Sequence, residues 1–126
     1  MIISLELDSE TPLYEQLCNQ IIIGIASGRL APGERLPAVR QLADDLGINM
    51  MTVNKAYALL KQQGYIVIDR RHGAQVNPQF DAPGVLPPAL EKQLTFIIAQ
   101  AKLHGIDPAH FSAICQQIYS DLMKAP

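Results

Sequence analysis

The sequence predicts a mainly α-helical, α+β protein in which three short helices and a basic hairpin precede two further helices. Apolar residues recur at helical spacing in five segments of the 126-residue chain. Glycines follow the ends of several of these segments, and a short β-branched run leads into paired arginines. The hydrophobic content of 48% is sufficient for a folded core.

Apolar and polar residues alternate at the N-terminus, which predicts a short strand that contains Ile3, Leu5 and Leu7. Thr11 and Pro12 then predict the start of the first helix, with the threonine hydroxyl as its cap. Gly28 is expected to follow the end of this helix. Its predicted buried stripe recurs every four residues and consists of Leu13, Leu17, Ile21 and Ile25.

The second helix is expected to begin at Pro37 and to end at Gly47, and Asn49 is expected to cap the third helix. Ala43 allows two helices to approach closely, Gly47 permits a sharp turn, and Val53 can pack between the helices. These offsets favour a helix-turn-helix over a helical hairpin of purely structural role. The predicted buried stripes are Val39, Leu42, Ala43 and Leu46 in the second helix, and Val53, Ala56, Tyr57 and Leu60 in the third.

A hairpin is predicted after the third helix, with strands at 65–69 and 74–76 and the arginine pair in the turn between them. We assign residues 1–77 to one domain, the proline-rich residues 78–88 to a linker, and residues 89–126 to a two-helix tail. Asp107 and Pro108 are expected to open the last helix. The apolar stripes of the tail consist of Leu90, Leu94, Ile97, Ile98 and Ala101, then Phe111, Ile114, Cys115, Ile118 and Leu122.

The net charge is −2, yet the charges are distributed unevenly. Between Arg29 and His72 there are seven basic residues and four acidic ones, whereas both flanking segments are acidic on balance. A basic middle is typical of a protein that meets phosphate with one face, although the residues can equally be ordinary solvated charges.

Polar and flexible side chains at the start of the third helix are not required by a core. Such a helix end can enter a major groove, and arginines at a hairpin tip can enter a minor groove. We therefore predict double-stranded DNA as the partner. The candidate contacts are Arg35, Arg40, Asn49, Met50, Met51, Thr52, Asn54, Lys55, Arg70, Arg71 and Gly73.

Three motifs resemble the winged-helix domain of GntR-family transcriptional regulators. They are Pro12-Leu-Tyr-Glu-Gln, the run from Gly28 to Ala43, and the run from Leu46 to Tyr57. The short two-helix tail is similar to that of the YtrA subfamily. The resemblance implies DNA contact by Arg40, dimerisation through the tail, and control of transporter operons. We expect a bacterial repressor, because a bound dimer can occlude polymerase without any activating surface.

Some residues depart from the family pattern. Ala38 stands where serine is common, and Met50 and Met51 replace the more usual proline and asparagine. In the predicted hairpin, which corresponds to the wing of the family, Ala74 and Gln75 follow Gly73 where the family usually has a hydroxyl residue and an aromatic residue. We therefore expect an altered base preference and weaker contacts from the wing.

Roughly forty residues make a poor independent core, so we expect the tail stripes to pack against a second copy of the chain. The alternative is that they fold back on the first helix of their own chain. The tail is too small to enclose a typical ligand pocket, so any small-molecule effector, of unknown identity, would bind between subunits or between domain and tail. His104 and His110 are expected at the surface rather than as ligands.

Several other functions are disfavoured by the sequence. The longest apolar run is broken at Gly24, no basic region precedes an apolar stretch, and Cys18 and Cys115 lack metal-ligand spacing. We expect a cytoplasmic protein with buried, reduced cysteines, no metal and no cofactor. The sequence contains neither a nucleophile paired with a base nor a phosphate-binding loop, so an enzyme is disfavoured. A winged-helix module that docks on proteins without nucleic acid remains the alternative function.

Overall fold

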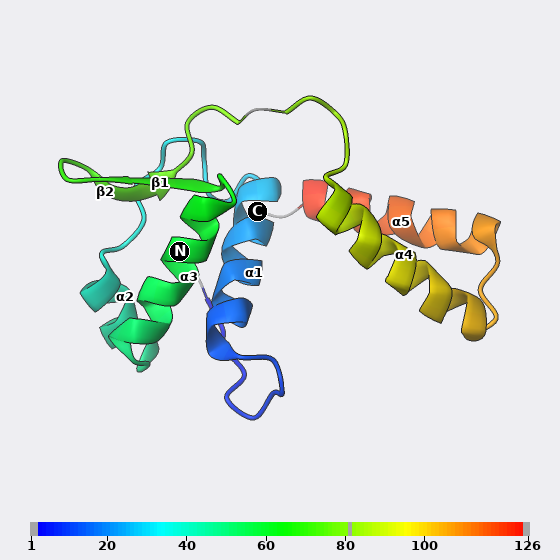
Figure 1. The fold of residues 1–126 in the computed structure, drawn as a ribbon, viewed down its shortest axis with the longest axis horizontal. Coiled ribbons are helices and arrows are strands. Elements are labelled where there is room, and N and C mark those ends of the chain that lie inside the picture. Colours follow the sequence, from blue (N-terminus) through cyan, green and yellow to red (C-terminus); the bar gives the residue numbers. More distant parts are fainter. Residues whose placement is uncertain (1–2, 81, 125–126) are drawn as a thin grey trace. The chain divides into compact units, whose positions relative to one another are not determined.

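The computed structural model describes residues 3–80 and 82–124. In chain order the helices are α1 (Leu13–Ala26), α2 (Val39–Leu46), α3 (Met50–Gln62), α4 (Pro88–Leu103) and α5 (Pro108–Met123). The strands β1 (Ile66–Asp69) and β2 (Gly73–Val76) lie between α3 and α4. The chain divides into two compact units, one that ends at Phe80 and one that follows it and ends at Lys124 (Figure 1). The mainly α prediction, with a winged helix-turn-helix and two further helices, is confirmed.

The core of the first unit lies where α3 packs against α1 and α2 (Figure 1). Leu17 and Ile21 of α1 and Val53 and Leu60 of α3 are fully buried, as their helical spacing predicts. Cys18 is also buried, its thiol donates to the Ala56 carbonyl at 3.5 Å, and burial raises the pKa of that thiol. It is therefore a structural residue of the α1–α3 interface.

The hairpin closes one end of this core. β1 and β2 are antiparallel, with Ile66 opposite Val76 and Asp69 opposite Gly73, and the side chains of Ile66 and Val76 are buried. Backbone hydrogen bonds add the segment before α2 to the outer edge of β2: Leu36 donates to Ala74 at 2.8 Å, and Val76 donates to Glu34 at 2.8 Å. The hairpin is thereby tied to the chain that leads into the helix-turn-helix.

The strand predicted at the N-terminus is wrong: residues 3–12 contain none. Two glutamines of α1 provide the hydrogen bonds that a neighbouring strand would make. The Gln16 side chain accepts a hydrogen bond from the Glu6 N–H at 2.8 Å through Oε1, and donates one to the Glu6 carbonyl at 2.9 Å through Nε2. The Gln20 side chain likewise accepts from the Ser4 N–H and donates to the Ser4 carbonyl. The segment therefore lies along α1, and Ile3 packs against the core.

Two predicted helix starts are also wrong. Thr11 does not cap α1, because Pro12 is itself the residue that precedes the helix, with an extended ψ of 146°. The Thr11 carbonyl instead accepts from the Gln16 amide at 2.8 Å. Likewise α2 begins at Val39 rather than Pro37, because the extended Ala38 provides the first backbone acceptor, for Leu42.

No helix within the described residues is long and apolar enough to cross a membrane.

Gly47 makes the turn between α2 and α3, with a φ of +67°. We expect Gly47→Ala to lower the free energy of unfolding by about 1 kcal/mol, because a Cβ disfavours this left-handed conformation. The space around Gly47 is open, so the penalty arises in the backbone alone. Gly47→Asn should restore much of the loss, since asparagine tolerates this region. Urea denaturation followed by circular dichroism measures both variants, and equal stability of the alanine variant would contradict the explanation.

Candidate nucleic-acid interface

The outer face of α3 is the centre of the candidate interface. Burial of Val53, Ala56, Tyr57 and Leu60 on one side of the helix leaves the opposite side exposed. That exposed side begins at the amino end of α3 and consists of Met50, Met51, Asn54, Lys55 and Ala58. Thr52 is half-buried. The structure therefore brings most of the predicted recognition residues onto one surface.

Asn49 acts first as a helix cap. Its Oδ1 accepts from the backbone N–H of Met51 at 2.8 Å, and its backbone is extended. The expected cap is confirmed, with the Met51 N–H as the donor. The side-chain oxygen is thus engaged within the helix, which leaves the amide NH2 as the group that can face a partner.

Lys55 lies against the aromatic ring of Tyr14, a contact that the sequence pattern does not predict. Its Nζ lies 3.9 Å from the centre of the Tyr14 ring on α1, a cation–π contact. Tyr14 falls next to the buried stripe of α1, and helical spacing within α1 carries no signal about a lysine forty-one residues later. The contact holds the Lys55 charge against the Tyr14 ring of α1.

Two arginines precede or open α2. Arg35 pairs with Gln75 as an isolated bridge on the edge of β2, and Arg40 is exposed in the first turn of α2. The connecting segment is fixed by Tyr57, whose hydroxyl donates to the Pro37 carbonyl at 2.7 Å. Burial raises the pKa of Tyr57, so this hydroxyl stays protonated. Neither arginine forms an ion pair with a carboxylate of the described residues.

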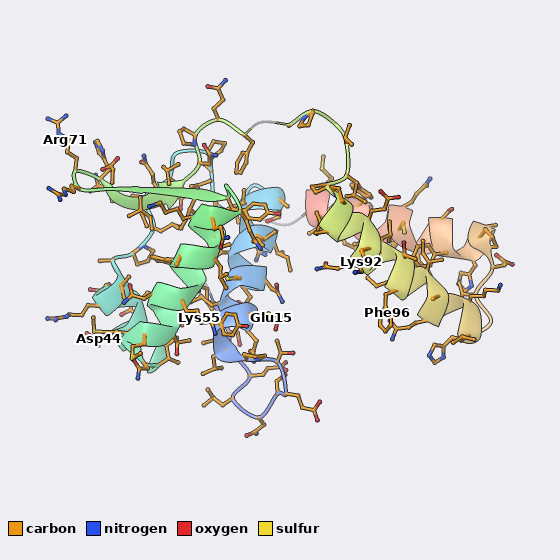
Figure 2. The ribbon with its side chains drawn as sticks, in the orientation of Figure 1. Glu15, Asp44, Lys55, Arg71, Lys92 and Phe96 are labelled. Carbon is orange, nitrogen blue, oxygen red and sulfur yellow. The ribbon has the colours of Figure 1, made fainter. Side chains whose placement is uncertain are left out.

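The hairpin tip presents Arg70 and Arg71, and Figure 2 shows Arg71 directed away from the body of the unit. Asp69 closes this turn: its Oδ1 accepts from the His72 N–H at 2.6 Å, and its Oδ2 lies 3.2 Å from His72 Nδ1. The hydrogen bond from the His72 backbone, followed by that from the His72 side chain, holds the pKa of Asp69 below its ordinary value. Gly73 has a φ of +66°, which lets the chain return into β2.

The candidate dimerisation residues lie in the second unit, where none of residues 82–124 is buried. Leu90, Leu94, Ile97, Ile98 and Ile118 are exposed. The half-buried ones are Ala101, Phe111, Ile114 and Leu122. Asp107 caps α5 as predicted, because it accepts from the His110 N–H at 2.8 Å.

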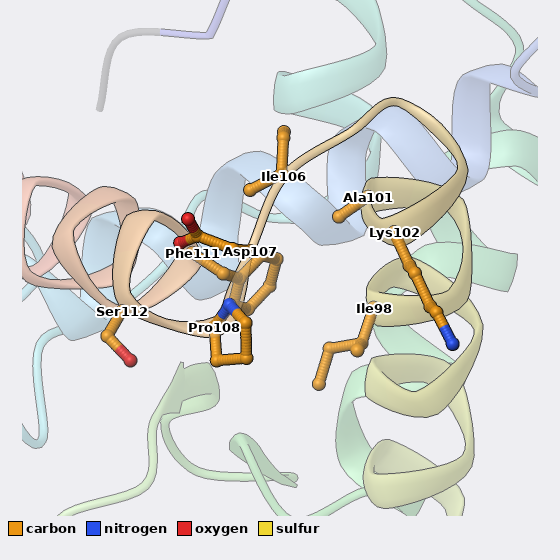
Figure 3. A pocket seen from close by; sticks show the side chains of 8 residues that line it. All are labelled: Ile98, Ala101, Lys102, Ile106, Asp107, Pro108, Phe111 and Ser112. Atoms are coloured by element: carbon orange, nitrogen blue, oxygen red, sulfur yellow. The ribbon is translucent and has the colours of Figure 1, made fainter.

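A pocket of about 570 Å³ opens between the end of α4 and the start of α5 (Figure 3). Ile98, Ile106 and Phe111 form much of its apolar wall, and Lys102 and Asp107 lie at its margin. Among the described residues, no three histidine, cysteine, aspartate or glutamate side chains come together in a group that could hold a metal ion.

The comparison with known families decides the classification. The family described as bacterial regulatory proteins, gntR family, matches residues 13–76, which span α1 to the end of β2. The chain belongs to this family. The expectation of a transcriptional regulator rather than an enzyme is thereby confirmed.

Two curated relatives carry related descriptions. The chain is 35% identical to the HTH-type transcriptional repressor YtrA of Bacillus subtilis over 84% of this chain and 77% of that protein. It is 46% identical to the HTH-type transcriptional regulator YdcR of Escherichia coli over 52% of this chain, but spans only 14% of that longer protein. The expected similarity to YtrA is confirmed by the first of these.

Solved structures show the same fold. The YtrA protein from Sulfolobus acidocaldarius, a GntR-family transcription factor, is 40% identical and superimposes with a TM-score of 0.66, over 82% of this chain and 99% of that one. The DNA-binding domain of AraR in complex with operator ORX1 is 26% identical and gives a TM-score of 0.52, over 59% of this chain and 92% of that one.

The wing turn should depend on pH only in strongly acidic solution. The pKa of Asp69 is lower in the folded chain than in the unfolded chain, so its carboxylate stabilises the turn above the unfolded value. This contribution is lost as the pH falls through the folded value, which lies below the ordinary 3.8. An NMR titration of the Asp69 carboxyl and the His72 amide measures the midpoint. Asp69→Asn serves as the control without the titrating group, and a midpoint at or above 3.8 would contradict the assigned hydrogen bonds.

Proposed function

We propose that this chain is a cytoplasmic repressor of transcription that binds an inverted-repeat operator as a homodimer. The observation that carries the proposal is the exposed amino end of α3, flanked by arginines with no ion pair to a described carboxylate. A helix end of this kind fits the major groove, and cations beside it can neutralise phosphates. The similarity to a repressor named YtrA and to an operator-bound domain of AraR supports the same function.

The residues divide by the kind of contact that they can make. Arg35 and Arg40 lie at the start of the helix-turn-helix and reach outward, which suits phosphates. Met50, Met51, Thr52 and Asn54 lie at the amino end of α3, which suits base edges. Arg70 and Arg71 project from the hairpin tip, which suits the adjacent minor groove. Asn49, Lys55 and Gly73 position these groups and come close to the backbone of the DNA.

The second unit supports the homodimer. A two-helix unit in which no described residue is buried has no core of its own, and large exposed apolar patches are unfavourable in water. A second copy offers the same stripes through a two-fold axis, which buries both. A two-fold dimer then presents two copies of α3 to an operator of matching symmetry. Occlusion of the promoter by the bound dimer is sufficient for repression.

Selection of bound oligonucleotides from a random pool tests the DNA function. We expect an inverted repeat and an affinity that falls steeply with salt, because phosphate contacts release counterions. Arg40→Ala should weaken binding to the selected site and reduce the slope of log affinity against log salt by about 1 per half-site.

Lys61→Ala is the matched control for Arg40→Ala. It removes the same charge from the last turn of α3, remote from the amino end, and should leave the slope nearly unchanged. A slope near zero for the unmodified protein would favour the protein-docking module over the DNA-binding regulator. An unchanged slope in Arg40→Ala would remove Arg40 from the interface.

Sedimentation equilibrium tests the dimer. Ile97 is 51% exposed in the single chain, so Ile97→Glu should leave each chain folded. It places a charge in the apolar stripe of α4, and we expect it to convert the dimer to monomer and to lower operator affinity at least tenfold, since burial of an unpaired charge is unfavourable. Ile23→Glu provides a control on α1 at a similar exposure of 45%. A monomer in the unmodified protein at micromolar concentration would contradict the proposal.

A further inference from the structure

Two thioether side chains lie on the exposed face of α3, at its amino end. Met50 is 40% exposed and Met51 is 76% exposed, at the first two positions of the helix. Neither belongs to the core, whose contribution from α3 consists of Val53, Ala56, Tyr57 and Leu60. Methionine is apolar, flexible and polarisable, so two such residues at the amino end of α3 offer an adaptable apolar surface to a partner.

Two neighbouring polar groups are engaged within the protein. The Asn49 oxygen accepts from the Met51 N–H at 2.8 Å, and the Lys55 ammonium lies 3.9 Å from the centre of the Tyr14 ring. Asn54 is exposed and has no hydrogen bond to a described residue through its side chain. Ala58 follows one turn later and is small enough for the helix to approach a groove closely. Met51, Asn54 and Ala58 share one face, at offsets of three and seven residues.

We propose that this face reads a thymine methyl group with Met51, next to an adenine that Asn54 contacts. In the major groove the thymine C5-methyl is the apolar group of the base edges, and asparagine bonds adenine N6 and N7 as a pair. A helix tip that offers methionines and the Asn54 amide, with its lysine held on Tyr14, matches an A·T step better than a guanine edge, which prefers arginine or lysine. The inference rests on the proposed DNA function and specifies the base chemistry of the same surface.

Replacement of thymine by deoxyuracil tests this directly, because it removes the methyl group and keeps the base pair. Each thymine of the selected half-site is replaced in turn, and affinity is measured for the full-length protein. We expect one position at which deoxyuracil weakens binding by about fourfold per half-site, because the complex then lacks the burial of one methyl group. Met51→Ala should bind the thymine and deoxyuracil sites equally at that position.

Met123→Ala is the matched control, since Met123 is 81% exposed in the second unit and should keep the full methyl dependence. The proposal is overturned if no thymine position responds, or if the response persists undiminished in Met51→Ala. A persistent response would mean that altered DNA shape or another residue senses the methyl group. Failure of the proposed function looks different, because the unmodified protein would then select no oligonucleotide at all.

Discussion

The packing of α3 against α1 is the constraint on which the first unit depends. Leu17 and Ile21 meet Val53 and Leu60 in a layer from which water is excluded, and Ile66 and Val76 of the hairpin close its end. Because one side of α3 is occupied by this layer, most of the opposite side is exposed. The same buried contacts therefore produce both the stability of the unit and the direction in which the exposed face of α3 points.

Local patterns in the sequence predict much of this arrangement, because helices and turns are decided within a few residues. The buried stripes of α1 and α3, the left-handed turn at Gly47 and the cap at Asn49 follow from spacing and backbone chemistry alone. Contacts between distant segments are not encoded in this way. Alternation at Ile3 and Leu5 indicates extended chain but not its partner, and that partner proves to be a pair of glutamine side chains rather than a strand.

The candidate site shows the same division between local and distant information. Sequence position places Met51, Asn54 and Lys55 on the exposed face of one helix, and the structure agrees. Sequence position does not show that Tyr14 holds the Lys55 ammonium or that Asn49 uses its oxygen on Met51. These two contacts change the chemistry of the face, since they withdraw polar capacity from it and leave the methionines prominent. The composition of the helix tip alone would have suggested a more polar surface.

The two units differ in the physical basis of their stability, and in the proposed homodimer this difference would link assembly to DNA binding. The first unit has its own core, whereas the second keeps apolar side chains such as Leu90, Leu94 and Phe111 partly or largely in contact with water. A single copy of the first unit would gain only the contacts of one half-site of the proposed operator. Two copies on one dimer raise the effective concentration of the second copy near the DNA, so avidity grows without any new contact. Burial of the tail stripes would therefore strengthen operator binding as directly as a residue that touches a base.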